Sequence, residues 1–471
     1  MILEIKYQVS RNHVLAKNMG RRQLLWNCTR RTRQRSLIRV SITSLSKQPK
    51  KYREAVSFFS NVALDHWELF KGLGPNTQLR LMEHLTVKTK KNPYPKHDFT
   101  QYMYKYPCYY RRAAIMEALG KVSSYMENMK RRERERNGKR PGIPKTGYVY
   151  PALYRGNCFD TVEDDPYHMK IKVWIRNTWD FITVPLRKSD VDYILHHCKN
   201  RKACVPTLRR RGKNWFLDFS FEERVSLTDE PIDEQTILAV DLGINSACVC
   251  CAMRSDGTIL GRRFLDLPKE EDSLAHALGR IKKAQQKGNY KTPRLWAAAK
   301  GINDRISVLT SQFIVDCAVF YNASTIVFEH LETRGKKRGG RSKRQRIHHW
   351  RASYVQQIVS DKAHRLFMHV VHVNAKGTSK LAFDGSGTVA RGIDAGFKTN
   401  SLCRFQSGKI YNCDLNASYN IGGRYFIREI LKSVPATERL RIEAKVPQCS
   451  RRSTCTLSTL ISLHAELNAA V

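Results

Sequence analysis

The sequence predicts a mixed α/β fold, because strand patterns and helix patterns alternate along much of its 471 residues. From about residue 235, three apolar strand candidates follow one another with short turns of Gly and Asp between them, a pattern typical of an antiparallel meander. Two further strand candidates, at 324–331 and 369–375, alternate with helical stretches. Strands that are first antiparallel and then separated by helices predict one mixed sheet with helices on its faces.

The region before residue 150 is expected to be mainly helical, after a short N-terminal strand. Residues 53–70 and 113–136 carry apolar side chains at spacings of three and four, with basic residues on the opposite face, as in amphipathic helices. The turn-rich segment 137–147 contains Gly and Pro, which end helices. These observations predict a first region at 1–150.

A small β-barrel is expected at 151–234, where short strand candidates alternate with basic turns. Arg209, Arg210 and Arg211 stand together at one of these turns, and we expect them to contact nucleic acid. Short strands, aromatic residues and basic turns suit a barrel that grips a nucleic-acid backbone. The strand candidates are 169–175, 179–186 and 214–225.

The charge of the chain points to a polyanionic partner. Lys and Arg number 83 against 42 Asp and Glu, which gives a formal net charge of +41 and a pI near 10.0. This excess goes beyond what solubility needs and favours nucleic acid, held through many phosphate contacts. Membrane binding is not expected, because no apolar stretch is long enough to span a bilayer and no lipidation motif is present.

The N-terminal residues MILEIKYQVSRNHV do not form a secretory signal pattern, because charges interrupt the apolar stretch. A cytoplasmic location is therefore expected. The 13 cysteines show no disulfide-like spacing, which favours reduced thiols. Cys248, Cys250 and Cys251 lie in an apolar segment, and we expect them to pack in the core, as free cysteines commonly do.

Three acids stand out by their positions in the predicted elements. Asp241 ends the strand TILAVD, Glu329 ends the strand STIVFE, and Asp414 opens a helix that also carries Asn416 and Asn420. If the two strands are neighbours, their acids project together, and a helix packed over that edge brings in the third. Carboxylate oxygens suit Mg²⁺ or Mn²⁺. Two such ions about 4 Å apart support phosphodiester cleavage.

Each acid also has a simpler interpretation. Asp241 precedes Leu-Gly and would serve as a turn residue, Glu329 would pair with a nearby arginine, and Asp414 would cap its helix. Taken together in a basic protein, the three favour a metal site.

The segments AVDLGIN, IVFEHL and YNCDLNASYNIG resemble the three motifs of the RuvC-type nuclease domain of TnpB proteins. These are RNA-guided nucleases of bacterial insertion sequences, and the compact type V CRISPR effectors are related to them. Residue by residue, Asp241, Glu329 and Asp414 match the catalytic acids of this family. The resemblance implies an RNase H-like RuvC nuclease lobe at 235–432, preceded by a helical recognition domain and a wedge-like barrel. From its own sequence pattern, the tail at 433–471 is expected to be weakly structured.

The resemblance further implies an RNA-guided DNA endonuclease that cleaves guide-matched DNA at one two-metal site holding Mg²⁺ or Mn²⁺. Its expected partners are a guide RNA, transposon-derived or CRISPR-derived, and target double-stranded DNA. The expected state is a monomer with one RNA in the bacterial cytosol, near the nucleoid. Two alternatives stay open: a nuclease-inactive RNA-guided repressor, and an unguided RNase H-like transposase or resolvase.

The chain departs from the family between the second and third acids. Family members often carry a zinc ribbon there, with two C-x-x-C pairs. This chain has GTSKLAFDGSG at 377–387, without the first pair, and later only Cys403 and Cys413. Two thiols do not make a tetrahedral zinc site. We expect no structural zinc and a remodelled loop at about 377–413, packed by other means.

A basic run at 334–350 follows Glu329 closely and is expected to hold guide and target by their backbones, with a solvated loop as the alternative. Aromatic residues alternate with Arg at 21–35 and 102–112. This mixture suits base stacking beside phosphate contacts, and half-buried core residues are the alternative. The residues of the run expected to contact nucleic acid are Arg334, Lys336, Lys337, Arg338, Arg341, Lys343, Arg344 and Arg346.

Overall fold

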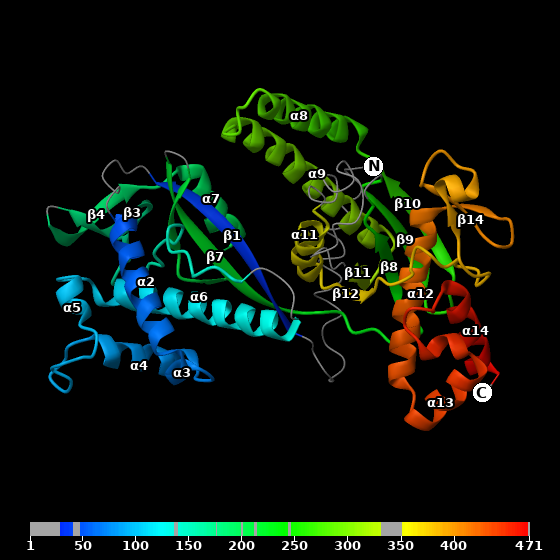
Figure 1. The fold of residues 1–471 in the computed structure, drawn as a ribbon, viewed down its shortest axis with the longest axis horizontal. Coiled ribbons are helices and arrows are strands. Elements are labelled where there is room, and N and C mark those ends of the chain that lie inside the picture. Colours follow the sequence, from blue (N-terminus) through cyan, green and yellow to red (C-terminus); the bar gives the residue numbers. More distant parts are fainter. Residues whose placement is uncertain are drawn as a thin grey trace. The chain divides into compact units, whose positions relative to one another are not determined.

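The described residues of the computed structural model fall into two compact units, each presented by itself below (Figure 1). One spans Arg33–Glu223, and the other spans Arg224–Val471 together with Thr29–Thr32. The structure describes residues 29–40, 48–135, 140–175, 177–198, 201–211, 214–243, 246–330 and 351–469, with side chains from residue 50 onward, apart from those of 135 and 211.

The second unit contains a five-stranded mixed sheet in the order β10-β9-β8-β11-β12. β8, β9 and β10, the first three strands of this sheet along the chain, pair antiparallel, and β8, β11 and β12 pair parallel. In chain order the strands run 3-2-1-4-5, which is the order of RNase H-like domains, so the predicted fold class is confirmed. The strands are β8 (Thr236–Asp241), β9 (Cys248–Arg254), β10 (Ile259–Leu265), β11 (Thr325–His330) and β12 (His369–Asn374).

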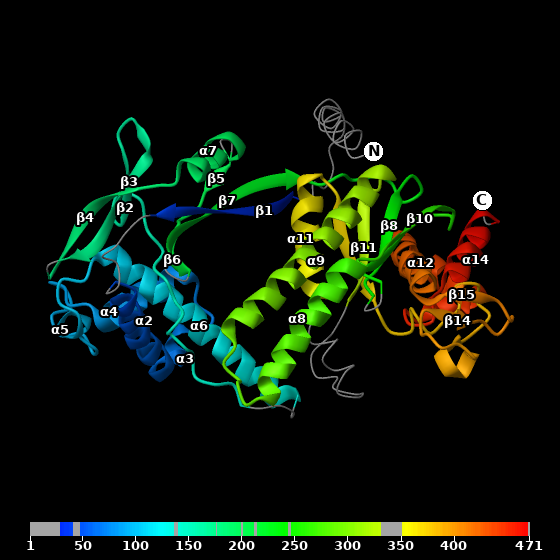
Figure 2. The same ribbon diagram turned by 90° about the horizontal axis from the view of Figure 1, so that it is seen from above.

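Helices cover both faces of this sheet, as Figure 2 shows for α9 and α11 on one side and α12 on the other. The helices are α8 (Pro268–Gln286), α9 (Pro293–Phe320), α11 (Ala352–Arg365), α12 (Cys413–Ser433), α13 (Ala436–Lys445) and α14 (Leu457–Asn468), with the short 3-10 helices η1 (Gly392–Ala395) and η2 (Pro447–Ser450).

Residues 237–240 of β8 are all apolar because both faces of the strand are buried there. Ile237 and Ala239 pack in the core on the α12 side, whereas Leu238 and Val240 pack in the core on the α9 and α11 side. Side chains of a strand alternate between faces, so a strand covered on both sides shows a continuous apolar run.

The cysteines of β9 follow the same alternation. Cys248 and Cys250 lie in the core beside α9, and Cys251 lies in the opposite core. All three are buried, which confirms that they pack in the core.

Helix α12 passes close to both the sheet and α14, because two adjacent glycines lie at the contacts. A Cβ on Gly422 would lie 2.9 Å from the sulfur of Met253, and a Cβ on Gly423 would lie 3.1 Å from the carbonyl oxygen of Thr456. The helix therefore fits between the sheet and the C-terminal segment only with small residues at these positions.

The expectation of a weakly structured tail after residue 433 is wrong. α13, η2 and α14 follow α12, and Ile442, Val446, Leu460 and Leu463 are buried in the core on the α12 side. These short helices have little stability alone and are held by packing of their apolar faces.

The segment at about 377–413 contains a small three-stranded sheet, in the order β13-β14-β15. Ala382, Cys403, Phe405 and Cys413 form its apolar cluster, and the expected lack of a structural zinc stays a prediction. The thiols of Cys403 and Cys413 share a hydrogen bond. The strands are β13 (Ala390–Arg391), β14 (Leu402–Arg404) and β15 (Ile410–Asn412).

The unit at Arg33–Glu223 combines helices with two sheets around one core. Phe59 of the first helix, Ile115, Ile171 and Leu217 all belong to this core. Its helices are α2 (Gln48–Asp65), α3 (Trp67–Phe70), α4 (Pro75–Thr86), α5 (Phe99–Tyr102), α6 (Cys108–Glu135) and α7 (Lys188–His197).

The strands of this unit form the sheets β2-β3-β4 and β1-β7-β5, with β6 also paired to β7. The strands predicted at 169–175, 179–186 and 214–225 are confirmed. The finer division at residues 150 and 234 stays a prediction. The strands are β1 (Thr29–Val40), β2 (Phe159–Val162), β3 (Asp165–Ile175), β4 (Thr178–Pro185), β5 (Lys202–Ala203), β6 (Thr207–Arg211) and β7 (Asn214–Ser226).

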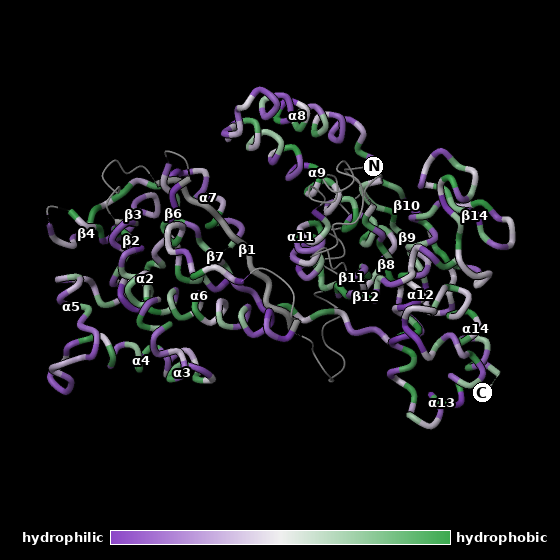
Figure 3. The backbone as a smooth tube through the Cα atoms, in the orientation of Figure 1, coloured by the Kyte–Doolittle hydropathy of each residue, from purple (hydrophilic) through white to green (hydrophobic). Residues whose placement is uncertain are grey.

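Hydrophilic and hydrophobic residues alternate along α8, as the colours of Figure 3 show. None of the helices in the described part of the chain is long and apolar enough to cross a membrane.

Candidate active site

Asp241 and Glu329 lie at the same edge of the sheet. β8 and β11 are parallel neighbours in which Phe328 pairs with Val240, so the next residues on the two strands are the two acids. Val327 packs in the core on the α12 side and Phe328 on the other. By alternation, the side chains of Glu329 and Asp241 project towards the α12 face.

Asp414 comes to this edge from the first turn of α12. Asn412 is the N-cap, and its side-chain oxygen accepts hydrogen bonds from the backbone N–H groups of Asp414 and Leu415, at 3.0 and 2.9 Å. Capping by Asn412 leaves the Asp414 carboxylate available, so the simpler interpretation of Asp414 as the cap is wrong. A Cβ on Gly243, just after β8, would lie 3.3 Å from Oδ2 of Asp414.

The three carboxylates are not balanced by enough positive charge. Burial raises the pKa of Asp241 well above its usual range, and the charges of Glu329 and Asp414 raise it further, against a lowering by Arg391. Burial also raises the pKa values of Glu329 and Asp414. Groups that are costly to ionise together at one edge are typical of sites completed by a cation.

Two arginines near the acids were not predicted from the sequence. The charge of Arg391 lowers the pKa values of Asp241 and Asp414. Its Nη2 donates to the carbonyl oxygen of Ser379, and its buried Nε has no hydrogen-bond partner in the structure. Arg424 of α12 is buried, and its charge lowers the pKa of Glu329.

Asp266, which directly follows β10, is a fourth acid that sequence reasoning missed. Its charge raises the pKa of Asp414, and its side chain is exposed. The available signal was its position, because an acid at the end of the third strand of an antiparallel meander returns to the edge where β8 ends.

Thr378 holds the carboxylate of Glu329. Its hydroxyl hydrogen bonds with Oε1 of Glu329 and lies 3.1 Å from the carbonyl oxygen of Ala375, and this contact lowers the pKa of Glu329 against the effect of burial. Asn420, fully buried on α12, donates to the carbonyl oxygens of Thr378 and Leu381. Asn420 thus fixes the loop that carries Thr378.

Asn416 has the same structural role one turn earlier. Its side chain accepts from the N–H of Phe383 and donates to the carbonyl oxygen of Leu381, at 2.8 and 2.9 Å. Both asparagines are therefore occupied with the backbone of the loop, and the three acids supply the oxygen donors at this edge.

The donor chemistry of these acids fits a divalent cation. Hard carboxylate oxygens are the ligands that Mg²⁺ and Mn²⁺ prefer, and added positive charge would offset the cost of ionising Asp241. Within the described ranges, however, no group of three or more His, Cys, Asp or Glu side chains is gathered closely enough to hold a metal ion. The three acids are neighbours, and a cation would have to draw them together.

The predicted nucleic-acid contacts are only partly described. The basic run at 334–350 lies outside the described residues, as does the side chain of Arg211. Nε of Arg209 is 3.2 Å from the buried carboxylate of Asp218, so Arg209 forms an ion pair within its own unit. Arg210 is exposed, with its guanidinium 5.9 Å from the ring centre of Trp215.

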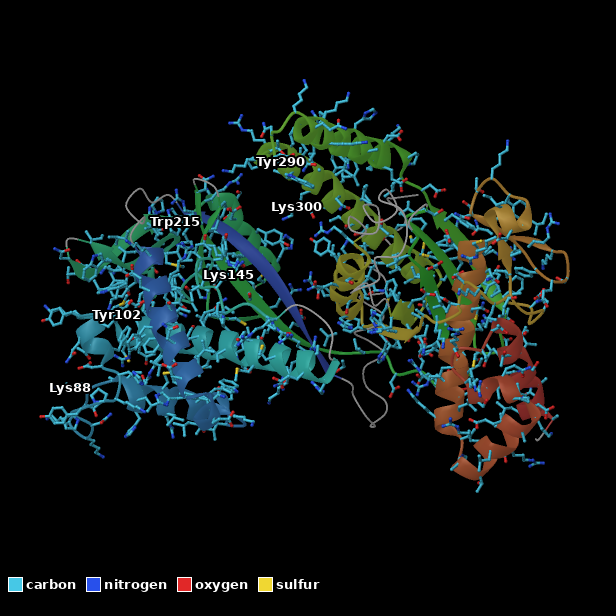
Figure 4. All side chains as sticks on the ribbon, viewed as in Figure 1. Lys88, Tyr102, Lys145, Trp215, Tyr290 and Lys300 are labelled. Atoms are coloured by element: carbon cyan, nitrogen blue, oxygen red, sulfur yellow. The ribbon has the colours of Figure 1, made fainter. Side chains whose placement is uncertain are left out.

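The aromatic segment at 102–112 divides into surface and core. Tyr102 and Tyr104 are exposed, and Figure 4 labels Tyr102, the last residue of α5. Tyr106 and Tyr110 are buried. The first pair is therefore available to a partner, whereas the second pair packs in the core.

The helical hairpin of α8 and α9 is a basic surface that was not among the predicted nucleic-acid contacts. Tyr290 and Trp296 are exposed near its turn, and Figure 4 shows Tyr290 and Lys300 on this hairpin. Exposed aromatic rings among cations suit a nucleic-acid partner. Its exposed basic residues include Lys282, Lys283, Lys287, Lys291, Arg294 and Lys300.

Comparison with known proteins gives a family model that matches the N-terminal part, and a curated relative. Residues 31–175 match the model of the Aq_aa04 family. A stretch of 91 residues is 35% identical to the uncharacterized protein aq_aa04 of Aquifex aeolicus (strain VF5), which covers 19% of this chain and 49% of that protein. The chain therefore spans about half the length of the curated relative it matches.

The chain is also distantly similar to solved structures of CRISPR effectors. One is a Cas12f1–sgRNA–target DNA complex, at 14% identity and TM-score 0.46, covering 83% of this chain and 98% of that chain. Another is CasPhi-2 (Cas12j) bound to crRNA, at 11% and 0.35, covering 83% and 97%. A third is C2c1 of Alicyclobacillus acidoterrestris with single-guide RNA, at 9% and 0.34, covering 90% and 69%.

Proposed function

We propose that this protein is a metal-dependent DNA endonuclease whose site is formed by Asp241, Glu329 and Asp414. The observation that carries the proposal is that three acids, distant in sequence, come to one edge of an RNase H-like sheet. Burial raises the pKa values of all three acids, and the charges of Glu329 and Asp414 raise that of Asp241 further, a cost that a basic chain has no structural need to create. A divalent cation would bind to these carboxylates, and a phosphodiester substrate would bind to the cation.

The roles of the side chains follow from their surroundings. Asp241 and Asp414 would hold Mg²⁺ or Mn²⁺, and Glu329, oriented by Thr378, would complete the ligand set. When bound, such ions supply an activated water and stabilise the leaving oxygen of a cleaved phosphodiester. Arg391, with a buried Nε that lacks a partner, would contact a non-bridging phosphate oxygen of the strand.

We further propose that recognition is guided by RNA. The three motifs resemble those of TnpB proteins and compact type V effectors, and the net charge of +41 far exceeds the need of one small substrate. A guide RNA and target DNA would together provide enough phosphates. Sequence choice would then belong to base pairing, while the protein binds backbone shape.

Sequencing of co-purified RNA tests this proposal. The protein is purified from cells that express its native locus, and the RNA bound to it is sequenced. We expect one discrete species with a constant scaffold and a segment that matches DNA. A broad mixture of cellular RNA, with DNA cleavage that needs no RNA, would instead support an unguided nuclease.

The variant Thr378→Val is expected to weaken metal-dependent cleavage without unfolding the protein. Valine keeps the shape of threonine but removes the donor to Glu329, so the pKa of Glu329 rises further. Loss of such a supporting hydrogen bond typically costs about 10–100-fold in metal affinity. Because the carboxylate must be ionised to bind a cation, the acidic limb of the pH–rate profile moves to higher pH.

The measurement is cleavage rate against Mg²⁺ concentration at several pH values. Thr310→Val is the matched control, because the Thr310 hydroxyl bonds only to the carbonyl oxygen of Ile306 within α9. Equal metal dependence in wild type and Thr378→Val would contradict the role of Thr378.

A further inference from the structure

A pocket of about 840 Å³ opens where β11 and β12 end. His330, the residue after Glu329, lines one side, and residues 374–376 line another. α12 and the segment 439–455 supply the remaining walls. The carboxyl ends of parallel strands are the usual place for ligands in α/β sheets, and this pocket shares that edge with the candidate acids.

The described lining of the pocket is strongly basic. It contains six Lys or Arg residues and no Asp or Glu. Lys376 and Arg452 are exposed and make no ion pair among the described residues. The other four are Arg424, which is buried, and Arg428, Lys432 and Arg439, which pair with Glu429 or Glu443.

The two walls that carry Lys376 and Arg452 are held together by Arg424. Its Nη1 donates to the carbonyl oxygens of Asn374 and Lys376, at 2.7 and 3.0 Å. Its Nε and Nη2 donate to the carbonyl oxygens of Cys455 and Ser453, each at 3.0 Å. A buried guanidinium with four backbone acceptors fixes the walls, so the pocket is formed before any ligand arrives.

The floor of the pocket is apolar. Val373, Ile427, Leu431, Cys449 and Cys455 line it, and all five are buried or nearly so. An apolar floor under cationic walls matches a nucleotide unit, whose phosphate is anionic and whose base and sugar have apolar faces. The volume lies within the range of roughly 300–1,000 Å³ that suits compact ligands, which favours a single strand over a duplex.

We propose that this pocket binds a single nucleic-acid strand, with Lys376 and Arg452 contacting phosphates and the apolar floor receiving a base or sugar. The inference rests on the proposed function, because the bound strand is the one whose phosphodiester lies at the acids. His330 directly follows Glu329, and only Gly377 separates Lys376 from Thr378. A strand at the acidic site would therefore continue into the pocket.

Photo-crosslinking to the full-length protein in EDTA tests this proposal without requiring cleavage. The probe is an oligothymidylate containing 4-thiothymidine, and crosslinked peptides are mapped by mass spectrometry. We expect crosslinks in the peptide at 446–456 and their loss in the double variant Lys376→Gln/Arg452→Gln. The charge-matched control is Lys398→Gln/Arg451→Gln, at exposed positions outside the pocket.

Salt-dependent binding of the same oligonucleotide adds a second measure. The slope of log K against log salt should fall by about 0.7 for each phosphate contact removed from a single strand. Unchanged crosslinks in the pocket variant would overturn the proposal. Binding of dTMP or pyrophosphate that depends on Lys376 and Arg452, without strand crosslinks, would overturn it in favour of a free-phosphate site.

The two proposals fail separately. Absence of pocket crosslinks, together with cleavage that depends on Asp241, refutes the strand pocket alone. If the pocket is crosslinked but cleavage does not depend on Asp241, the catalytic assignment is refuted. The proposal that the pocket leads a strand to these acids is then refuted as well.

Discussion

Asp241→Ala is expected to abolish cleavage while leaving nucleic-acid binding intact. Asp241 interacts electrostatically with both other acids, because the charges of Glu329 and Asp414 both raise its pKa. Alanine at this position removes one of the three proposed metal ligands. We therefore expect the cleavage rate to fall by roughly a thousandfold, or about 4 kcal/mol of transition-state stabilisation. The measurement is single-turnover cleavage of guide-matched DNA, with binding followed in parallel by gel shift.

Asp272→Ala is the control for this variant, because Asp272 is an exposed acid on α8. It removes the same charge far along the chain from the candidate acids and should cleave at the wild-type rate. Guide-dependent cleavage by Asp241→Ala at the wild-type rate would disprove the assignment of the acids.

Asp241→Asn is expected to make the metal-free protein more stable against unfolding. The folded-state pKa of Asp241 is raised by burial and by its acidic neighbours, so the folded protein holds a proton more tightly than the unfolded chain. Asp241 therefore lowers the free energy of unfolding once the pH rises above about 3.9, the pKa of aspartate in the unfolded chain. Asparagine removes this cost.

Thermal unfolding without divalent metal measures the effect. The midpoint for Asp241→Asn should exceed that of wild type at neutral pH, and the difference should shrink as pH falls towards 4, a value near the ordinary pKa of aspartate. Added Mg²⁺ should stabilise wild type more than the variant. A variant less stable than wild type at neutral pH would contradict the electrostatic description of the site.

Arg424→Met is expected to cause the largest loss of stability among the substitutions considered. Arg424 is 4% exposed and donates to four backbone carbonyls from two separate segments. Methionine fills similar space but leaves those carbonyls without their donor. The bond to Cys455 is buried and the other three are partly buried. At about 1–3 kcal/mol for a fully buried unsatisfied group and less for a partly buried one, the loss is about 3 kcal/mol or more, a large share of a typical domain's stability.

The measurement is thermal unfolding together with limited proteolysis. We expect a lower thermal unfolding midpoint. We also expect new proteolytic cleavage within 446–456, because this segment would no longer be held by Arg424. Arg441→Met, at an exposed position on α13, is the control and should change little. Arg424→Lys should recover part of the loss, because an ammonium keeps the charge but not the planar fork. A midpoint for Arg424→Met equal to that of Arg441→Met would contradict the wall-fixing role.

The strands and the three acids were predictable because their signals are local. The unbroken apolar run of β8 follows from burial on both faces, and the acid at its end interrupts that run visibly. Glu329 shows the same pattern on β11. A parallel pairing of these two strands then places both acids together without any further information from the sequence.

The C-terminal helices were missed because their stability is not local. α13 and α14 are short, and their apolar residues, such as Ile442 and Leu460, are buried by contact with other parts of the unit. Sequence pattern alone does not show whether a partner surface exists for such a face.

The sequence by itself determined the mixed sheet, the positions of Asp241, Glu329 and Asp414, and the excess of positive charge. Only the tertiary structure decided that Asn412 caps α12, that Thr378 holds Glu329, and that Arg424 is buried between two walls of a basic pocket. In sequence, Arg424 resembles every other arginine of this basic chain. Its burial depends on segments near Asn374 and Ser453, 50 and 29 residues away, and contacts at such separations arise only when the chain has folded.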